Sequence, residues 1–171
     1  EAYNNCGNAL LELNKIEESI VYFNKAIEIN PNYAEAYYNL GNALKNFKKL
    51  NEAVVSYTKA IQLKFENVGV YNNLGNVFLE LQQPKKALIN YDKAIRIKSD
   101  SSEAHYNRGN SLVELKEIKK AIESFDKAIE IKSDYAEAFK NRGYALLNLN
   151  KIEDSLYSIN RAFQLNPESD Y

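Results

Sequence analysis

The stretch at residues 37–46, "YYNLGNALKN", decides the fold because its pattern returns along the whole chain. Glycine costs a helix interior about 0.5–1 kcal/mol relative to alanine, and asparagine is a poor helix former. Even so, glycine recurs at one constant interval, at Gly7, Gly41, Gly75, Gly109 and Gly143, and alanine keeps the same interval at Ala26, Ala60, Ala94, Ala128 and Ala162. Two residue types in register five times indicate a repeat of about 34 residues.

Each repeat is predicted to form two amphipathic helices. In the second repeat, Tyr37, Leu40 and Leu44 follow the i, i+3, i+7 spacing of a buried helical face, which predicts a helix over about 34–47. A second apolar stripe predicts a helix over about 51–64. No strand pattern competes, so the fold class is all-α. We expect the glycine to lie where the two helices cross, with the small Ala60 completing the close approach.

Composition narrows the function classes. The chain has 171 residues and a net charge of −1, without the run of Lys or Arg that would predict a nucleic-acid partner. No apolar run reaches the roughly 18 residues of a membrane span, and no signal-peptide pattern opens the sequence. Cys6 is the single cysteine, so an intrachain disulfide is excluded. Together these features favour a cytoplasmic location, without membrane contact.

The sequence carries no catalytic motif, so we expect no enzyme activity, no cofactor and no metal. Cys6 is interpreted as a packed structural thiol, and His105 has no partner with which to hold a metal. Arg108 and Arg142 either bind a partner or lie partly buried between helices, and the second interpretation is favoured. Methionine is absent even at position 1, which predicts that the chain is excised from a longer protein.

The repeat resembles the tetratricopeptide repeat family over its whole length. The family pattern places an aromatic residue four positions before the repeat glycine, then small and aromatic residues on the second helix. The first of these positions is held here by Tyr3, Tyr37, Tyr71, His105 and Phe139. Pro31 and Pro167 match the family's inter-repeat proline, whereas Ser99 and Ser133 depart from it. The resemblance implies a right-handed superhelical solenoid whose first helices line a concave groove that binds peptides.

We therefore expect one array over residues 1–171, with repeats at about 1–33, 34–67, 68–101, 102–135 and 136–169. Such arrays normally need polar capping ends. Both ends cut inside a repeat, so we expect the last helix pair to expose Phe139, Leu146, Ile159 and Phe163. Exposed apolar faces at the two ends predict possible head-to-tail self-association.

Asparagines on the first helices are the candidate functional site. They form two rows, one turn apart on one helical face, made of Asn5, Asn39, Asn73, Asn107 and Asn141, and of Asn8, Asn42, Asn76 and Asn110. Neighbouring helices pack about 8–10 Å apart, close to the length of three residues of extended chain at about 3.3 Å each. An amide offers a donor and an acceptor to a peptide group. The rows therefore predict backbone contacts to an extended peptide.

Apolar contacts to the same peptide are expected from Tyr38, Tyr106 and Tyr144, together with Leu11, Leu79, Val113 and Leu147. Three alternatives stay open at this point. The asparagines can instead bond neighbouring helices. The rows also resemble those in the repeat arm of O-GlcNAc transferases, which implies a substrate-presenting arm of a larger glycosyltransferase. Finally, the array can be purely structural and stack end to end. The leading hypothesis is a non-catalytic scaffold that binds a protein or peptide segment.

Overall fold

The computed structural model describes residues 1–167, and within this range the chain forms ten α-helices and no strand. The first helices of the repeats are α1 (Ala2–Glu12), α3 (Ala34–Asn46), α5 (Val68–Glu80), α7 (Ser102–Glu114) and α9 (Ala136–Asn148). The second helices are α2 (Ile16–Ile29), α4 (Leu50–Gln62), α6 (Pro84–Ile97), α8 (Ile118–Ile131) and α10 (Ile152–Leu165). The all-α prediction is confirmed, and the two helices expected in the second repeat end within two residues of their predicted limits.

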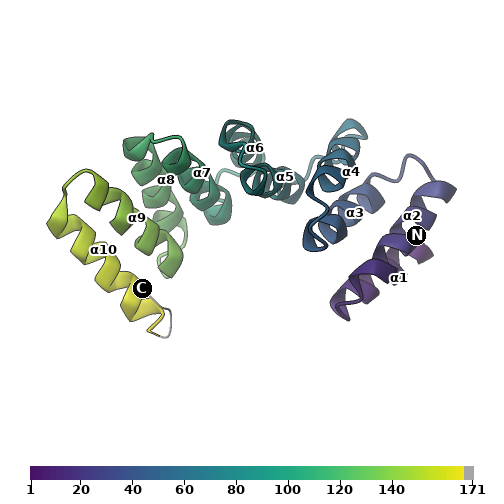
Figure 1. The fold of residues 1–171 in the computed structure, drawn as a ribbon, viewed down its shortest axis with the longest axis horizontal. Coiled ribbons are helices and arrows are strands. Elements are labelled where there is room, and N and C mark those ends of the chain that lie inside the picture. The colour runs from purple at the N-terminus through teal and green to yellow at the C-terminus, as the bar shows by residue number, and fades with distance from the viewer. Residues whose placement is uncertain (168–171) are drawn as a thin grey trace. The chain divides into compact units, whose positions relative to one another are not determined.

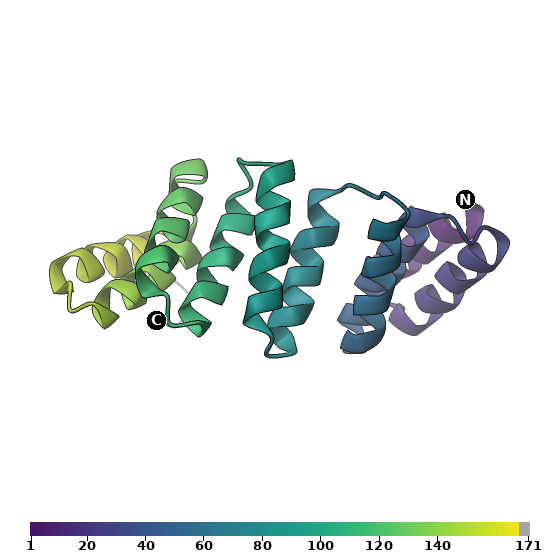
Figure 2. The ribbon, with the colours of Figure 1, turned by 90° about the horizontal axis from the view of Figure 1, so that it is seen from above.

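The chain divides into two compact units, residues 1–82 with α1–α5 and residues 83–171 with α6–α10. Inside each unit the two helices of a repeat pack side by side, as α1 with α2 and α9 with α10 show (Figure 1). The pairs α3–α4 and α7–α8 are seen from a second direction in Figure 2. First helices of successive repeats also touch, α1 with α3, α3 with α5, and α7 with α9. These last contacts bring the asparagine rows together.

Tight turns set the antiparallel pairing within a repeat. Lys48 follows α3 with φ at 60°, and the next backbone N–H, that of Lys49, donates to Leu44 O at 2.9 Å. This left-handed residue closes the helix end and reverses the chain. The same conformation recurs at Asn14, Lys116 and Asn150. None of these residues is glycine, so the glycines of the repeat serve another purpose.

Three of the repeat glycines, Gly7, Gly41 and Gly109, make room for a ring rather than for a close approach of two backbones. A Cβ added at Gly41 would lie 2.6 Å from the Tyr57 ring, and the rings of Phe23 and Phe125 face Gly7 and Gly109 in the same way. The expectation that a small alanine fills this space was therefore wrong. Alanines such as Ala60 are buried, but the group that meets the glycine is the large side chain three positions earlier on the second helix.

Each unit has its own apolar core. Phe23, Tyr57 and Val70 are fully buried in the first unit, and Phe125 and Leu112 are buried in the second. The core is continuous across successive repeats within a unit, because helices of neighbouring repeats contribute to the same cluster. This arrangement fixes the first helices, and with them the asparagine rows.

Ser111 is the one buried polar side chain in residues 1–167 whose hydroxyl has no hydrogen-bond partner. Alanine holds the equivalent position in α3 and α9, at Ala43 and Ala145, and is buried there. An unsatisfied buried hydroxyl costs about 1–3 kcal/mol. We expect Ser111→Ala to raise the free energy of unfolding by about 1 kcal/mol in urea titrations. A loss of stability would show that the hydroxyl has a partner after all.

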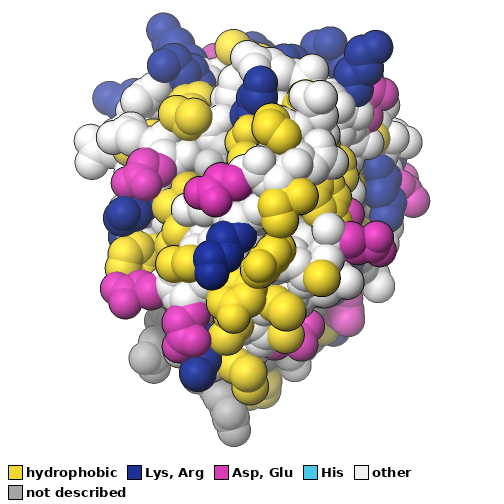
Figure 3. All heavy atoms as spheres, turned by 90° about the vertical axis from the view of Figure 1, so that its right-hand side faces the viewer, with side chains coloured by type: hydrophobic (Ala, Val, Ile, Leu, Met, Phe, Trp, Pro, Cys, Tyr) yellow, Lys and Arg dark blue, Asp and Glu magenta, His cyan; other side chains and the backbone are white. Residues whose placement is uncertain are grey.

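The exposure of apolar side chains on the first and last helices differs in part from the expectation. Phe139 and Leu146 are buried, because they pack into the second unit rather than lying on an open face, so this part of the prediction was wrong. Ile159 is half-buried, and Phe163 is exposed as expected. At the other end, Cys6 and Ala9 of α1 are exposed, so Cys6 is not the packed thiol that we expected. Figure 3 faces this end and shows apolar side chains gathered among charged ones.

Candidate functional site

The asparagine rows form hydrogen bonds between successive first helices. In the first unit, Asn73 Nδ2 of α5 donates to Asn42 Oδ1 of α3 at 2.9 Å and to the Tyr38 hydroxyl at 3.4 Å. The buried Tyr57 hydroxyl also donates to Asn42 Oδ1, at 2.8 Å. Asn42 is therefore held by two donors, and its amide plane is fixed. We call Asn42 and Asn73 the first amide pair.

The second unit repeats this geometry. Asn141 Nδ2 of α9 donates to Asn110 Oδ1 of α7 at 2.8 Å and to the Tyr106 hydroxyl at 3.1 Å. We call Asn110 and Asn141 the second amide pair. The two pairs lie two repeats apart and have the same donor, the same acceptor and the same supporting tyrosine. A bond made twice by equivalent residues is a feature of the repeat rather than an accident of packing.

The first repeat departs from this scheme. Asn39 Nδ2 donates at 3.0 Å to Asn4, which stands where the other bonded pairs have a tyrosine. Asn4 is fully buried, and its own Nδ2 reaches Glu35 at 3.5 Å. Asn39 is itself only 9% exposed, so its amide bonds a neighbouring helix. Asn5 is exposed and Asn8 half-buried, whereas Asn76 and Asn107 are half-buried residues of α5 and α7.

Tyr38 and Tyr106 contribute to packing as well as to the amide pairs. The Tyr38 ring lies 5.3 Å from that of Phe65, and the Tyr106 ring lies 5.0 Å from that of Tyr135, measured between centroids. Tyr144 is 43% exposed and Leu147 is 50% exposed. Among the residues expected to give apolar contacts, Leu11, Leu79 and Val113 are half-buried.

Each amide pair leaves one donor group and one acceptor for a further partner. Both N–H bonds of Asn73 and Asn141 are directed at neighbouring helices, but no hydrogen bond from the described residues reaches their Oδ1 atoms. Conversely, Asn42 and Asn110 accept through Oδ1, and their Nδ2 atoms donate to no described residue. All four side chains are half-buried. A peptide group needs one such acceptor for its N–H and one such donor for its C=O.

A pocket of about 250 Å³ lies at the second amide pair. Its lining comes from α7 and α9: Asn110, Val113, Glu114, Asn141, Tyr144, Ala145 and Asn148. Four of these residues, Asn110, Val113, Asn141 and Tyr144, belong to the site predicted from the sequence. Glu114 and Asn148 were not predicted. Their signal in the sequence was weak, because polar residues one turn beyond an asparagine row look like an ordinary solvated helix face.

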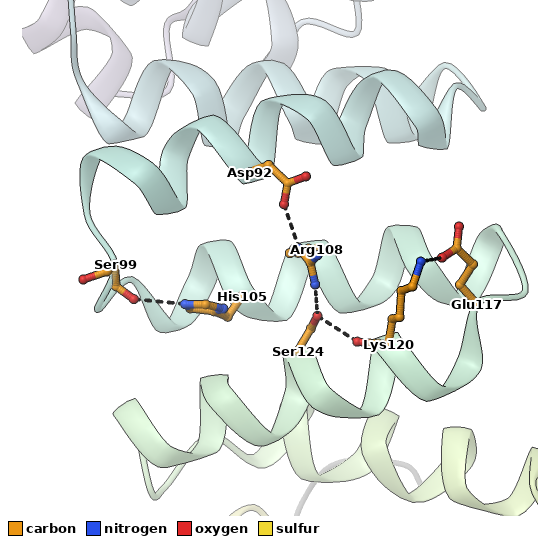
Figure 4. A network of polar contacts seen from close by, with 7 residues as sticks. All are labelled: Asp92, Ser99, His105, Arg108, Glu117, Lys120 and Ser124. Carbon is orange, nitrogen blue, oxygen red and sulfur yellow. Dashed lines mark hydrogen bonds and ion pairs between the residues drawn. The ribbon is translucent and has the colours of Figure 1, made fainter.

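Arg108 and Arg142 join three helices each. Arg108 Nε donates to Asp92 of α6 at 2.7 Å and its Nη1 donates to Ser124 of α8 at 2.6 Å (Figure 4). Arg142 bonds Asp126 and Ser158 in the same way. The interpretation of these arginines as partly buried residues between helices is confirmed. The aspartates were missed, although an aspartate at the same interval before each arginine was a usable signal.

His105 and the acidic residues form no metal centre in the part of the chain that is described. His105 Nε2 lies 3.0 Å from the backbone oxygen of Ser99 (Figure 4). No group of three or more His, Cys, Asp or Glu within residues 1–167 is placed to hold an ion. Over the same residues, no helix combines the length and the apolar character that crossing a membrane requires.

Comparison with known proteins decides the family. The family model described as "TPR repeat" matches residues 7–46, 75–116 and 109–150, and a second one, "Tetratricopeptide repeat", matches residues 34–67. The chain belongs to the tetratricopeptide repeat family. The resemblance noted from the glycine and alanine register is thereby confirmed. No curated protein matches this tetratricopeptide repeat chain.

Solved structures place the fold in the same family. The chain is 28% identical to YrrB, described as a TPR protein with an unusual peptide-binding site, with a TM-score of 0.83, covering 97% of this chain and 86% of YrrB. It is 22% identical to a MamA structure, with a TM-score of 0.89 and 95% of each chain covered. MamA from Desulfovibrio magneticus RS-1 is 20% identical, with a TM-score of 0.91, 99% of this chain and 96% of that chain covered. The MamA likenesses show the fold alone.

Proposed function

We propose that this tetratricopeptide repeat protein is a non-catalytic interaction scaffold that binds an extended peptide segment through its amide pairs. The observation that carries the proposal is that the two asparagines of each pair keep different hydrogen-bonding groups unused. Asn73 and Asn141 keep an unused acceptor, and Asn42 and Asn110 keep an unused donor group. Bonds between helices hold these amides in place, so little side-chain entropy is lost when a ligand binds.

The bonds to neighbouring helices and the proposed bonds to a peptide are compatible. Each bond from an amide to a peptide group contributes about 0.5–1.5 kcal/mol net. Four such bonds give about 4 kcal/mol, which corresponds to millimolar affinity. The pocket at the second amide pair would have to add the rest. YrrB, whose description includes a peptide-binding site, supports a peptide as the ligand.

Replacing Asn42 and Asn110 by Asp tests the proposal without breaking the helix contacts. The Asp side chain keeps an oxygen for Asn73 and Asn141 but loses the N–H groups that would donate to a peptide carbonyl. We expect the double variant to stay folded and to bind a capped, uncharged Ser/Ala peptide about tenfold more weakly, in an NMR titration. Asn24→Asp combined with Asn160→Asp adds the same two negative charges at exposed positions of α2 and α10 and is the control. Unchanged affinity in the folded double variant would refute the proposal.

We also propose head-to-tail self-association as a second property, supported by the exposed end faces. Leu156 of α10 is 56% exposed, whereas its equivalents in the other second helices are half-buried. On α1, Ala9 is exposed, whereas its equivalents Ala43 and Ala145 are buried. Each face thus lacks the neighbour that a further repeat provides, and a second copy offers the complementary face.

Sedimentation checks this property. The average mass should rise with concentration, and Leu156→Lys should return the protein to a monomer because it places a charge in the apolar contact. Val55→Lys is the matched control, since Val55 is a similarly exposed residue, at 69%, on α4 within the array. A monomer at every concentration, or equal effects of the two variants, would count against self-association.

The remaining parts of the proposal concern the context of the chain. We propose that the five repeats act as one array and that the protein works in a reducing compartment such as the cytoplasm, which suits its single exposed cysteine. No partnership with nucleic acid is proposed. A substrate-presenting arm of a glycosyltransferase would use the same amide pairs, and sequencing of the parent gene for a catalytic domain distinguishes this alternative.

A further inference from the structure

We infer that the pocket at the second amide pair takes an arginine side chain of the bound peptide. The inference rests on the proposed function and adds a preference for one ligand residue. The pocket has a volume of about 250 Å³ and lies between α7 and α9. Both members of the second amide pair, Asn110 and Asn141, line it. It therefore adjoins the proposed path of the ligand backbone.

The polar lining of the pocket contains three acceptor groups beside one unused donor group, Asn110 Nδ2. Glu114 is exposed, and no ion pair or hydrogen bond joins its side chain to another described residue. Asn148 Nδ2 donates to the backbone oxygen of Tyr144 at 3.0 Å. Its Oδ1 is left as an acceptor for another donor. Asn141 contributes the unused Oδ1 of the amide pair. Three acceptor groups thus line one pocket, and Glu114 is its only charged residue.

The rest of the lining is apolar and suits a long aliphatic stem. Val113 and Ala145 contribute aliphatic surface, and the half-exposed ring of Tyr144 contributes a flat aromatic one. A guanidinium group carries five N–H donors in one plane, has no acceptor, and stacks on aromatic rings. Its chemistry complements several acceptors beside a tyrosine better than the compact ammonium group of lysine does.

The equivalent place in the first unit lacks this character, which makes the preference local. Lys45 stands there at the position of Val113, Asn46 at that of Glu114 and Glu80 at that of Asn148, so a positive charge replaces an apolar wall and the carboxylate lies on the other helix. Glu80 holds the same position as Glu114 one repeat earlier, but its carboxylate is already paired with Lys48 at 2.8 Å. The charge of Glu114 is open to a ligand, whereas Glu80 already has Lys48 as an ion-pair partner at the surface. Glu80 therefore supplies the matched control for an experiment on Glu114.

Two capped peptides that differ in one residue test the inference. One is a Ser/Ala peptide with a central arginine, and the other carries citrulline, the uncharged isostere of arginine, at the same place. In NMR titrations at low salt we expect the arginine peptide to bind about fivefold more tightly, the upper range for an exposed ion pair. Glu114→Gln should remove this preference, and Glu80→Gln should retain it.

The outcomes separate the inference from the proposed function. Equal affinities for the two peptides, or a preference that survives in Glu114→Gln, would overturn the arginine assignment. If the citrulline peptide nevertheless shifts the side-chain amide signals of Asn42 and Asn110, the proposed function stands without the inference. If neither peptide shifts those signals, both the arginine assignment and the proposed function are refuted. A lysine peptide that matches the arginine peptide would also overturn the assignment, because it would leave only unspecific charge attraction.

Discussion

Raising the pH above about 10 should unfold the protein, and its buried tyrosines should set how steeply stability falls. Burial raises the pKa of Tyr57, Tyr91 and Tyr135 well above the ordinary value of 10.0. Smaller contributions come from Tyr38 for Tyr57, from Glu103 for Tyr91, and from Tyr106 for Tyr135. These hydroxyls stay neutral in the folded chain while the unfolded chain releases their protons.

The direction of this pH dependence follows from the number of protons bound by the folded and unfolded chains. Above the unfolded pKa the folded chain binds more protons than the unfolded chain, so the free energy of unfolding decreases as the pH rises. The stabilisation is complete below about pH 10 and is lost above it, by about 1.4 kcal/mol per pH unit for each tyrosine. Three tyrosines give a loss of about 4 kcal/mol per pH unit. Urea titrations across this range measure it.

A double variant, Tyr57→Phe and Tyr91→Phe, isolates the tyrosine contribution. Phenylalanine holds the same repeat position at Phe23 and Phe125, where it is fully buried, so the core accepts it. The loss per pH unit should fall to about a third, while stability at neutral pH decreases slightly because the bond from Tyr57 to Asn42 is removed. An unchanged dependence on pH would mean that other groups govern alkaline unfolding.

Gly41→Ala should lower the free energy of unfolding by about 2 kcal/mol, despite the better helix propensity of alanine. The new Cβ would lie 2.6 Å from two carbons of the Tyr57 ring. That ring is fully buried, and its hydroxyl is bonded to Asn42, so it cannot move away freely. Overpacking of this kind costs about 3 kcal/mol at the upper end of the usual range, and the propensity gain returns about 1 kcal/mol.

Gly143→Ala is the matched control for this prediction. Its Cβ would lie 2.6 Å from Ile159 Cγ1 and 3.3 Å from the backbone oxygen of Ser155, but Ile159 is half-buried on α10 and no hydrogen bond holds its side chain, unlike the Tyr57 ring. We expect less than half of the loss seen for Gly41→Ala, in the same denaturant titrations. Equal losses, or a gain in stability at Gly41, would contradict the view that the glycine makes room for a pinned ring.

The sequence predicts the helices well because the repeat supplies the same evidence five times. The helix limits and the buried stripe of Leu40 and Leu44 follow from spacing alone. The purpose of the glycines does not, because spacing cannot tell a close approach of backbones from a cavity filled by Tyr57. The arginines illustrate the same limit: Arg108 stands at the repeat position that Leu40 and Leu74 hold, but its partners Asp92 and Ser124 come from two other helices.

The candidate site was predicted in part. The spacing of the asparagines showed that they share one helical face, and it left open whether they bond helices or ligands. The structure places Asn39 in a buried bond between helices, whereas Asn42 and Asn110 retain unused N–H groups. That distinction follows the row, because Asn39, Asn73 and Asn141 donate to the preceding first helix whereas Asn42 and Asn110 accept. It could not be derived before the contacts between first helices were known.

The most direct test of the central claim is to observe the side-chain amide signals themselves. In proton–nitrogen correlation spectra, titration with the uncharged Ser/Ala peptide should shift the Nδ2 signals of Asn42 and Asn110 and leave that of the exposed Asn24 in place. The shifts are expected because these N–H groups exchange water for a peptide carbonyl. Binding that shifts other signals while both of these stay fixed would contradict the account.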